Sequence, residues 1–206
     1  MANIGRLHVL VGPTRSDSAI ELTKQVLDAG AHVVQVRVKG VDDGVWIDLA
    51  GPIVELCHEY GATSIVNDRA DVCLAVGADG VHVGADDLPV AAARKVVGPD
   101  RLVGGTARNA STAATHASDG ADYLGVGPVY ETASKEGLPN ASGVELVEGV
   151  TVSVDLPVIA ISGVTIDRVP EILAAGAHGV AVIGAIARAP DPAAAVRGFL
   201  EALGES

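Results

Sequence analysis

The chain has 206 residues, a net charge of −12 and an apolar content of 49%, whereas aromatic residues make up only 2%. This hydrophobicity excludes intrinsic disorder, and the scarcity of aromatic rings argues against stacking platforms for single-stranded nucleic acid. The acidic balance excludes nucleic acid and anionic membranes as general partners, because like charges repel. A small anionic substrate stays compatible with this charge, since a cleft can be locally basic on an acidic protein.

The length fits one domain, residues 1–206, with a core made mainly of Val, Ala, Leu and Ile. Two cysteines, Cys57 and Cys73, lie far apart without metal-ligand spacing, which favours buried thiols in a reducing cytosol over a disulfide. The first residues lack the long apolar segment of a signal peptide, and the longest uncharged apolar stretch, residues 179–187, is too short to cross a bilayer. We therefore expect a cytoplasmic protein.

Short apolar runs bounded by glycine recur along the chain and predict eight strands. They cover residues 7–11, 32–38, 63–66, 80–83, 101–105, 123–127, 156–161 and 179–183. Between them lie segments with helical periodicity, over residues 19–29, 45–60, 90–97, 111–118, 144–153, 166–175 and 192–203. The interval between the third and fourth strands leaves room only for a brief helix. This alternation predicts parallel strands joined by crossover helices, with both faces of the sheet buried.

Four junctions between a helix and the next strand share a Gly-Ala dipeptide, beginning at Gly30, Gly77, Gly120 and Gly176. A glycine there can end the preceding helix in a left-handed conformation. The repetition favours a closed α/β barrel of eight strands, the (β/α)8 or TIM barrel, over an open doubly wound sheet. No G-x-G-x-x-G follows the first strand, which makes a dinucleotide fold less favoured.

Polar side chains at strand ends are the candidate functional residues, because the active sites of such barrels lie at the carboxyl ends of the strands. Gln35, Arg37 and Lys39 stand two residues apart at the end of the second strand, so they share one face. Polar groups inside a barrel are costly unless they meet a ligand or a partner. Two cations and an amide aligned inward predict a site for a phosphate or diphosphate. The alternative is that the strand frays early and all three point into solvent.

Two aspartates follow neighbouring strands. Asp68 lies in the segment Asn67-Asp68-Arg69 after the third strand, and Asp87 follows the fourth, so their carboxylates can converge. Two hard oxygen ligands beside a diphosphate suit Mg²⁺, with water and phosphate oxygens completing the octahedron. The alternative is that each aspartate caps the helix after it. Together with the basic residues of the second strand, the pair favours metal binding.

The later strand ends add hydroxyls, a further cation and glycines. A long loop after the sixth strand lacks apolar periodicity, which is typical of lids and binding loops. Glycines after the last two strands would let backbone N–H groups approach a phosphate, although ordinary turn glycines look the same. These candidates are Thr106, then Thr132, Ser134 and Lys135 in the long loop, then Gly163 and Gly184. The six histidines form no nucleophile or metal pattern, so we interpret them as core or surface residues.

Six segments spread along the chain match one known family: QVRVK (35–39), NDR (67–69), GADGVHVGADDLP (77–89), GADYLGVGPVYETASK (120–135), AISGVT (160–165) and GAHGVAVIGAI (176–186). In order and spacing they resemble the thiamine-phosphate synthase family, to which the thiazole tautomerase branch is related. The resemblance covers nearly the whole chain. It implies a TIM barrel, Mg²⁺, and a transferase that joins a hydroxymethylpyrimidine diphosphate to a thiazole phosphate and releases thiamine phosphate and pyrophosphate. Its partners would be these two small phosphorylated substrates, with homo-oligomerisation left open.

The resemblance also implies roles for single residues. Gln35, Arg37 and Lys39, with Asn67 beside them, would contact the pyrimidine diphosphate, and Asp68 and Asp87 would bind Mg²⁺. Thr106 would supply a hydroxyl where the family has serine, and Lys135 would contact the diphosphate. The thiazole phosphate would bind to the loop residues Thr132, Ala133 and Ser134 and to the backbone of Gly163, Ile183 and Gly184. Mg²⁺ and the catalytic cations Arg37, Lys39 and Lys135 would stabilise the departing diphosphate, without a protein nucleophile.

The chain departs from the family at three positions: Ala85 replaces a glutamine, Ser162 a glycine and Gly184 a serine. These changes would loosen the pyrimidine and phosphate sites, so two other interpretations stand beside the synthase. One is the thiazole tautomerase, which the segment 131–138 favours, although Arg108 stands where that branch has its catalytic histidine. The other is a non-catalytic paralogue that binds a phosphorylated ligand.

Overall fold

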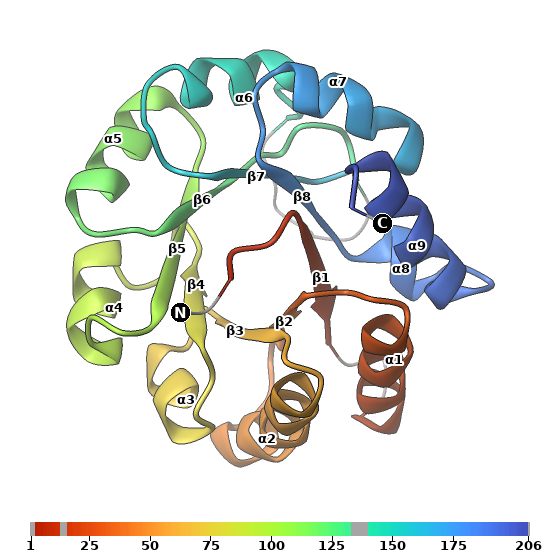
Figure 1. Ribbon diagram of the computed structural model, residues 1–206. Helices are drawn as coiled ribbons and strands as arrows, with labels where there is room; N and C mark the ends of the chain where they lie inside the picture. The colour runs from red at the N-terminus through yellow and green to blue at the C-terminus, as the bar shows by residue number, and fades with distance from the viewer. Residues whose placement is uncertain (1–2, 13–15, 133–139, 206) are drawn as a thin grey trace.

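The protein folds as a closed barrel of eight parallel strands, which pair in chain order until β8 meets β1 (Figure 1). The computed structural model describes residues 3–12, 16–132 and 140–205. The closed order confirms the predicted TIM barrel, and the open doubly wound sheet is wrong. The strands are β1 (Leu7–Val11), β2 (Val33–Val36), β3 (Thr63–Asn67), β4 (Gly80–Val83), β5 (Leu102–Ala107), β6 (Tyr123–Val126), β7 (Val158–Ile161) and β8 (Gly179–Val182).

Helices surround the barrel and cover the outer face of the strands (Figure 1). As predicted, the helix between β3 and β4 is brief. The helices are α1 (Ser16–Asp28), α2 (Asp43–Glu59), α3 (Ala70–Ala75), α4 (Val90–Val97), α5 (Ala110–Ser118), α6 (Gly143–Thr151), the 3₁₀ turn η1 (Ile166–Arg168), α7 (Val169–Ala174), α8 (Gly184–Ala187) and α9 (Pro192–Ala202). None of the described helices has the length and apolar character needed to span a membrane.

The apolar strands pack on both faces. A small cluster fills the inside of the barrel, and a much larger one lies between the strands and the helices. Both faces are therefore buried, which explains why the strands are nearly all apolar in sequence. The inner cluster consists of Leu10, Val33, Ile65, Tyr123, Ile159 and Ala181.

The four Gly-Ala junctions take the predicted backbone conformation. Gly30, Gly77, Gly120 and Gly176 have φ angles of 95°, 70°, 89° and 91°. Each glycine ends the helix before it and returns the chain to the amino end of the next strand, which is the turn that the repetition predicted.

Several predicted element ends are wrong by a few residues. The strand expected over residues 32–38 covers only Val33–Val36, although the Arg37 amide still donates to the Val11 carbonyl at 2.7 Å. The strand expected over 156–161 begins at Val158, because Pro157 has no N–H to pair. The helix expected over 166–175 is divided into η1 and α7, and the short helix α8 was not predicted.

Candidate active site

A cavity of about 520 Å³ opens at the carboxyl ends of the strands, and residues from all eight strands or the loops after them line it. This is the volume of a pocket for a small molecule, in the place where TIM barrels carry out their chemistry. Within the described residues, five basic side chains line it beside four acidic ones, although the protein as a whole is strongly acidic. The basic residues are Arg37, Lys39, Arg108, Arg168 and Arg188.

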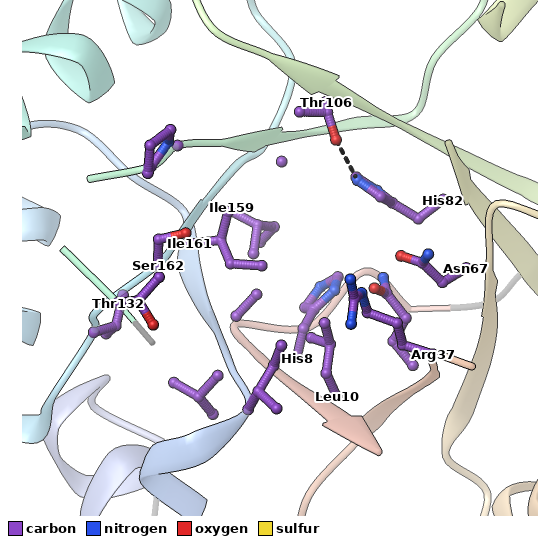
Figure 2. Close-up of a pocket in the computed structure, with 18 of the residues that line it drawn as sticks. His8, Leu10, Arg37, Asn67, His82, Thr106, Thr132, Ile159, Ile161 and Ser162 are labelled. Carbon is purple, nitrogen blue, oxygen red and sulfur yellow. Dashed lines mark hydrogen bonds between the residues drawn. The ribbon is translucent and has the colours of Figure 1, made fainter. Parts of the chain in front are cut away.

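The three polar residues of the second strand reach this cavity, as their spacing predicted. Gln35 lies buried on β2, Arg37 is half-buried, and Lys39 is exposed at the rim. The strand does end early, at Val36, but the three side chains do not all point into solvent, so the alternative interpretation is wrong on that point. Figure 2 shows Arg37 beside Asn67 and His8 on one side of the pocket. No ion pair to Arg37 occurs in the part of the chain that the structure describes.

Asp68 and Asp87 converge at the end of β4. A β-carbon placed on Gly84 would lie 2.6 Å from Asp87 Oδ2 and 3.7 Å from Asp68 Oδ1, so both carboxylates turn toward one point. Lys39 Nζ donates to Asp68 Oδ2, and the Gly84 amide donates to Asp87 Oδ2 at 3.0 Å. Partial burial, together with the neighbouring Asp68 carboxylate, raises the pKa of Asp87.

Neither aspartate caps a helix, so that alternative is wrong. The N-cap of α3 is Arg69 and that of α4 is Pro89, and neither makes a side-chain capping bond. Asp68 instead takes the left-handed conformation, with φ of 69°, which aspartate tolerates better than most residues. The backbone conformation thus holds this carboxylate at the rim of the cavity.

A polar network that the sequence analysis missed lies below the rim. His82 joins Thr106 and Tyr123: Nε2 lies 3.0 Å from Thr106 Oγ1 and Nδ1 lies 3.1 Å from the Tyr123 hydroxyl (Figure 2 shows the first contact). His8 lies beside the Tyr123 ring, with ring centroids 5.3 Å apart. The burial of His8 and His82 confirms the interpretation of core histidines for these two, although both also line the cavity.

The stability of the protein should fall in mild acid because of His8. Its Nε2–H donates to the Ile4 carbonyl at 2.6 Å, and burial lowers its pKa to about 3 from the ordinary 6.5. Below pH 6.5, His8 therefore binds a proton in the unfolded chain but stays neutral in the folded chain. The contribution of neutral His8 to the free energy of unfolding is complete above pH 6.5 and is lost as the pH falls toward 3. The loss is about 1.4 kcal/mol at pH 5.5.

Urea denaturation of the wild type and of His8→Gln, at pH 7.5 and pH 5.5, measures this effect. The wild type should lose about 1.4 kcal/mol more than the variant between the two pH values. Equal losses in both proteins would contradict a neutral, buried His8.

The opposite side of the cavity carries the candidate phosphate contacts. Gly163, Ile183 and Gly184 line it, and so does the half-buried Thr132. Figure 2 shows Thr132 and Ser162 together, across the pocket from Arg37 and Asn67. Lys135, Ala133 and Ser134 lie outside the described residues, so their implied roles stay predictions.

Ser162 adopts a backbone conformation that suits glycine, with φ of 84°. A side chain there costs roughly 1 kcal/mol or more, which a glycine would avoid. Ser162→Gly should therefore raise the free energy of unfolding by about 0.5–1 kcal/mol, part of the gain being offset by the greater freedom of the unfolded chain. Urea denaturation checks this, with Ser142→Gly as the control, because Ser142 has φ of −108° and should only lose stability.

The closed parallel barrel and the polar cavity at the carboxyl ends of its strands define a TIM-barrel enzyme. A family model described as thiamine monophosphate synthase matches residues 7–186. The chain belongs to this family.

Similar proteins agree with this membership. A thiamine-phosphate synthase from Salinispora tropica is 49% identical over 206 residues, which cover 98% of this chain and 99% of that protein. One from Methanospirillum hungatei is 41% identical over 184 residues, which cover 89% of each chain. The solved structure of thiamine phosphate pyrophosphorylase from Pyrococcus furiosus superimposes with a TM-score of 0.87 at 32% identity, covering 97% of this chain and 95% of that one.

Proposed function

We propose that this chain is a Mg²⁺-dependent thiamine-phosphate synthase built as one barrel domain, residues 1–206. It joins a pyrimidine diphosphate to a thiazole phosphate and releases thiamine phosphate and pyrophosphate. The observation that carries this proposal is the convergence of Arg37, Lys39, Asp68 and Asp87 on one side of a cavity of about 520 Å³. The family and its named relatives support the same transferase activity.

The β2–β4 side of the cavity suits the diphosphate. Arg37 and Lys39 supply positive charge, and Gln35 and Asn67 supply amide groups beside the buried part of the pocket. Charge-assisted hydrogen bonds from such cations to phosphate oxygens are shorter and stronger than neutral ones. The walls of the pyrimidine subsite would be His82, Tyr123 and Thr106, whose mutual hydrogen bonds fix their orientation.

The residues present fit a Mg²⁺ ion. No cluster of three or more His, Cys, Asp or Glu side chains able to hold a metal occurs within residues 3–12, 16–132 and 140–205. Two converging carboxylates match Mg²⁺, which usually takes one or two protein carboxylates and fills its octahedron with water and substrate phosphate. Asp68 and Asp87 would hold the ion, which when bound neutralises negative charge on the diphosphate.

The reaction breaks one bond and forms one. The C–O bond between the pyrimidine methylene and the diphosphate breaks, and its electron pair leaves with the pyrophosphate. The thiazole nitrogen donates its lone pair to the same methylene carbon, which forms the new C–N bond. Arg37 and Lys39 stabilise the charge that grows on the leaving group, and the barrel walls hold the two substrates in line.

The second substrate fits the β6–β8 side of the cavity. Thr132, Gly163 and Gly184 line the cavity from the loops after β6, β7 and β8, and Figure 2 shows Thr132 across the pocket from Arg37 and Asn67. On this arrangement the thiazole nitrogen would attack the methylene carbon as positive charge develops on it during departure of the diphosphate. We place the reaction in the cytoplasm, where phosphorylated intermediates are available and the two free cysteines stay reduced.

Incubation of the purified protein with both substrates and Mg²⁺ tests the proposal. Thiamine phosphate and pyrophosphate should form in equal amounts, and EDTA should stop their formation. Absence of thiamine phosphate under these conditions would refute the synthase. Interconversion of thiazole isomers without metal would identify a tautomerase instead.

A further inference from the structure

We infer that Arg168 binds the phosphate group of the thiazole substrate and selects that substrate by its charge. This inference rests on the proposed function. Arg168 ends η1, which follows β7, and its side chain lines the cavity together with Gly163 and Gly184. A cation there faces the β6–β8 side, whereas Arg37 and Lys39 come from β2, across the barrel.

A phosphate on this side needs a charged donor. A phosphate monoester carries a charge of about −1.5 to −2 at pH 7, with three acceptor oxygens. Position 184 is glycine, so this chain has no hydroxyl there to donate. The backbone groups of Gly163 and Gly184 are neutral, so a guanidinium beside them supplies the charge that they lack.

Contacts with two loops hold the Arg168 side chain in place. Its guanidinium carbon lies 4.2 Å from the centre of the Tyr130 ring, and Nη1 donates to the Gly163 carbonyl at 2.6 Å. The Tyr130 hydroxyl in turn donates to Glu171 Oε1, which anchors the ring. Burial and the bond to Glu171 raise the pKa of Tyr130 to about 12, so the hydroxyl stays protonated.

These contacts leave the Arg168 guanidinium ordered and able to bind an anion. The half-buried guanidinium stacks on the ring, and the bond to Gly163 uses one of its five N–H groups, so others can bind phosphate oxygens. Because the side chain is already ordered, little rotamer entropy is lost when the ligand binds. The same carbonyl bond places the cation next to the Gly163 backbone, at the phosphate end of the cavity.

The competing explanation is a purely structural brace. Arg168 joins Tyr130 of the β6–α6 loop to Gly163 of the β7–η1 loop, and such a link would stiffen both loops. A brace would affect any ligand on this side of the cavity, charged or neutral. A phosphate contact would affect only the phosphorylated ligand, so a comparison of the two separates the explanations.

Calorimetric titration with thiazole phosphate and with the unphosphorylated thiazole alcohol provides this comparison. Arg168→Gln should weaken binding of the phosphate by at least about tenfold and change the affinity for the alcohol less than about twofold. Mg²⁺-pyrophosphate, which binds across the cavity, should keep its affinity. The matched control is Arg197→Gln, an exposed arginine on α9 away from the cavity, which should change none of the three affinities.

Arg168→Lys provides a second variant that keeps the charge without the planar fork. It should retain a preference for the phosphate over the alcohol that is intermediate between the wild type and Arg168→Gln. Equal weakening of phosphate and alcohol in either variant, or an unchanged phosphate affinity, would overturn the inference. Product formation by the wild type is a separate readout, so a wild type that prefers the phosphate but makes no thiamine phosphate would refute the proposed function alone.

Discussion

Asp87→Asn is expected to lower kcat/KM for thiamine phosphate formation by at least about 100-fold while leaving the protein as stable as the wild type or more so. The asparagine oxygen can still accept from the Gly84 amide, so the loop keeps its hydrogen bond. What is lost is one of two oxygen ligands and its charge, and removal of one preorganised electrostatic contact costs roughly 10²–10³ in rate. Stability should rise because the Asp68 carboxylate loses a neighbour of like charge.

Two measurements made together check this prediction. Initial rates over a range of Mg²⁺ concentrations should show that the variant needs more Mg²⁺ to reach its half-maximal rate and that its maximal rate is lower. Urea denaturation should show no loss of stability. Asp86→Asn is the matched control, since it removes the same charge one residue away, from an exposed side chain at the same rim of the cavity. A similar loss of rate in both variants, or a loss of stability in Asp87→Asn, would contradict a metal ligand at position 87.

The sequence predicted the rim of the cavity well because strand geometry fixes it. Residues two apart on a strand share a face, and this alternation continues past the end of β2 at Val36: the Arg37 amide still bonds to the Val11 carbonyl, and Gln35, Arg37 and Lys39 all line the cavity. Parallel strands end at the same side of a barrel, which brought Asp68 and Asp87 together although they lie far apart in the chain. Both inferences need only local periodicity and the order of the strands.

The buried residues that line the cavity inside the barrel could not be predicted from the sequence in the same way. Both faces of these strands are buried, so an apolar run does not tell which residues point into the barrel and which toward the helices. His82 and Tyr123 sit in such runs, and each looks like an ordinary core residue. The register between strands, which pairs Asn67 with His82, is the signal that would have placed His82 in the site.

Contacts between loops also could not be predicted from the sequence. Arg168 meets Tyr130 and Gly163 through the packing of the β6–α6 and β7–η1 loops, and no spacing in the sequence predicts that stacking. Ser162, which precedes Gly163 in the second of these loops, has a positive φ of 84°. Such features follow from tertiary packing, whereas the rim residues follow from secondary structure alone.

Arg37→Ala is expected to weaken binding of the pyrimidine diphosphate by about 2 kcal/mol, or roughly 30-fold, because a charge-assisted contact is lost from a half-buried site. Arg37 lines the cavity and makes no ion pair within the described residues, so no protein carboxylate there neutralises its charge. Its backbone amide bonds to Val11 in the barrel, and a change of side chain leaves that bond intact. The strand should therefore keep its place in the variant.

Titration of Mg²⁺-pyrophosphate into the wild type, Arg37→Ala and Arg37→Lys measures the effect in isolation from turnover. The lysine variant should recover part of the affinity through its charge, but not the geometry of a guanidinium fork. Arg197→Ala, on the exposed face of α9, is the matched control and should bind as the wild type does. Since Arg37 and Arg168 serve opposite ends of the cavity, Arg37→Ala should leave the affinity for thiazole phosphate unchanged. An unchanged pyrophosphate affinity in Arg37→Ala would show that the diphosphate does not bind on the β2 side.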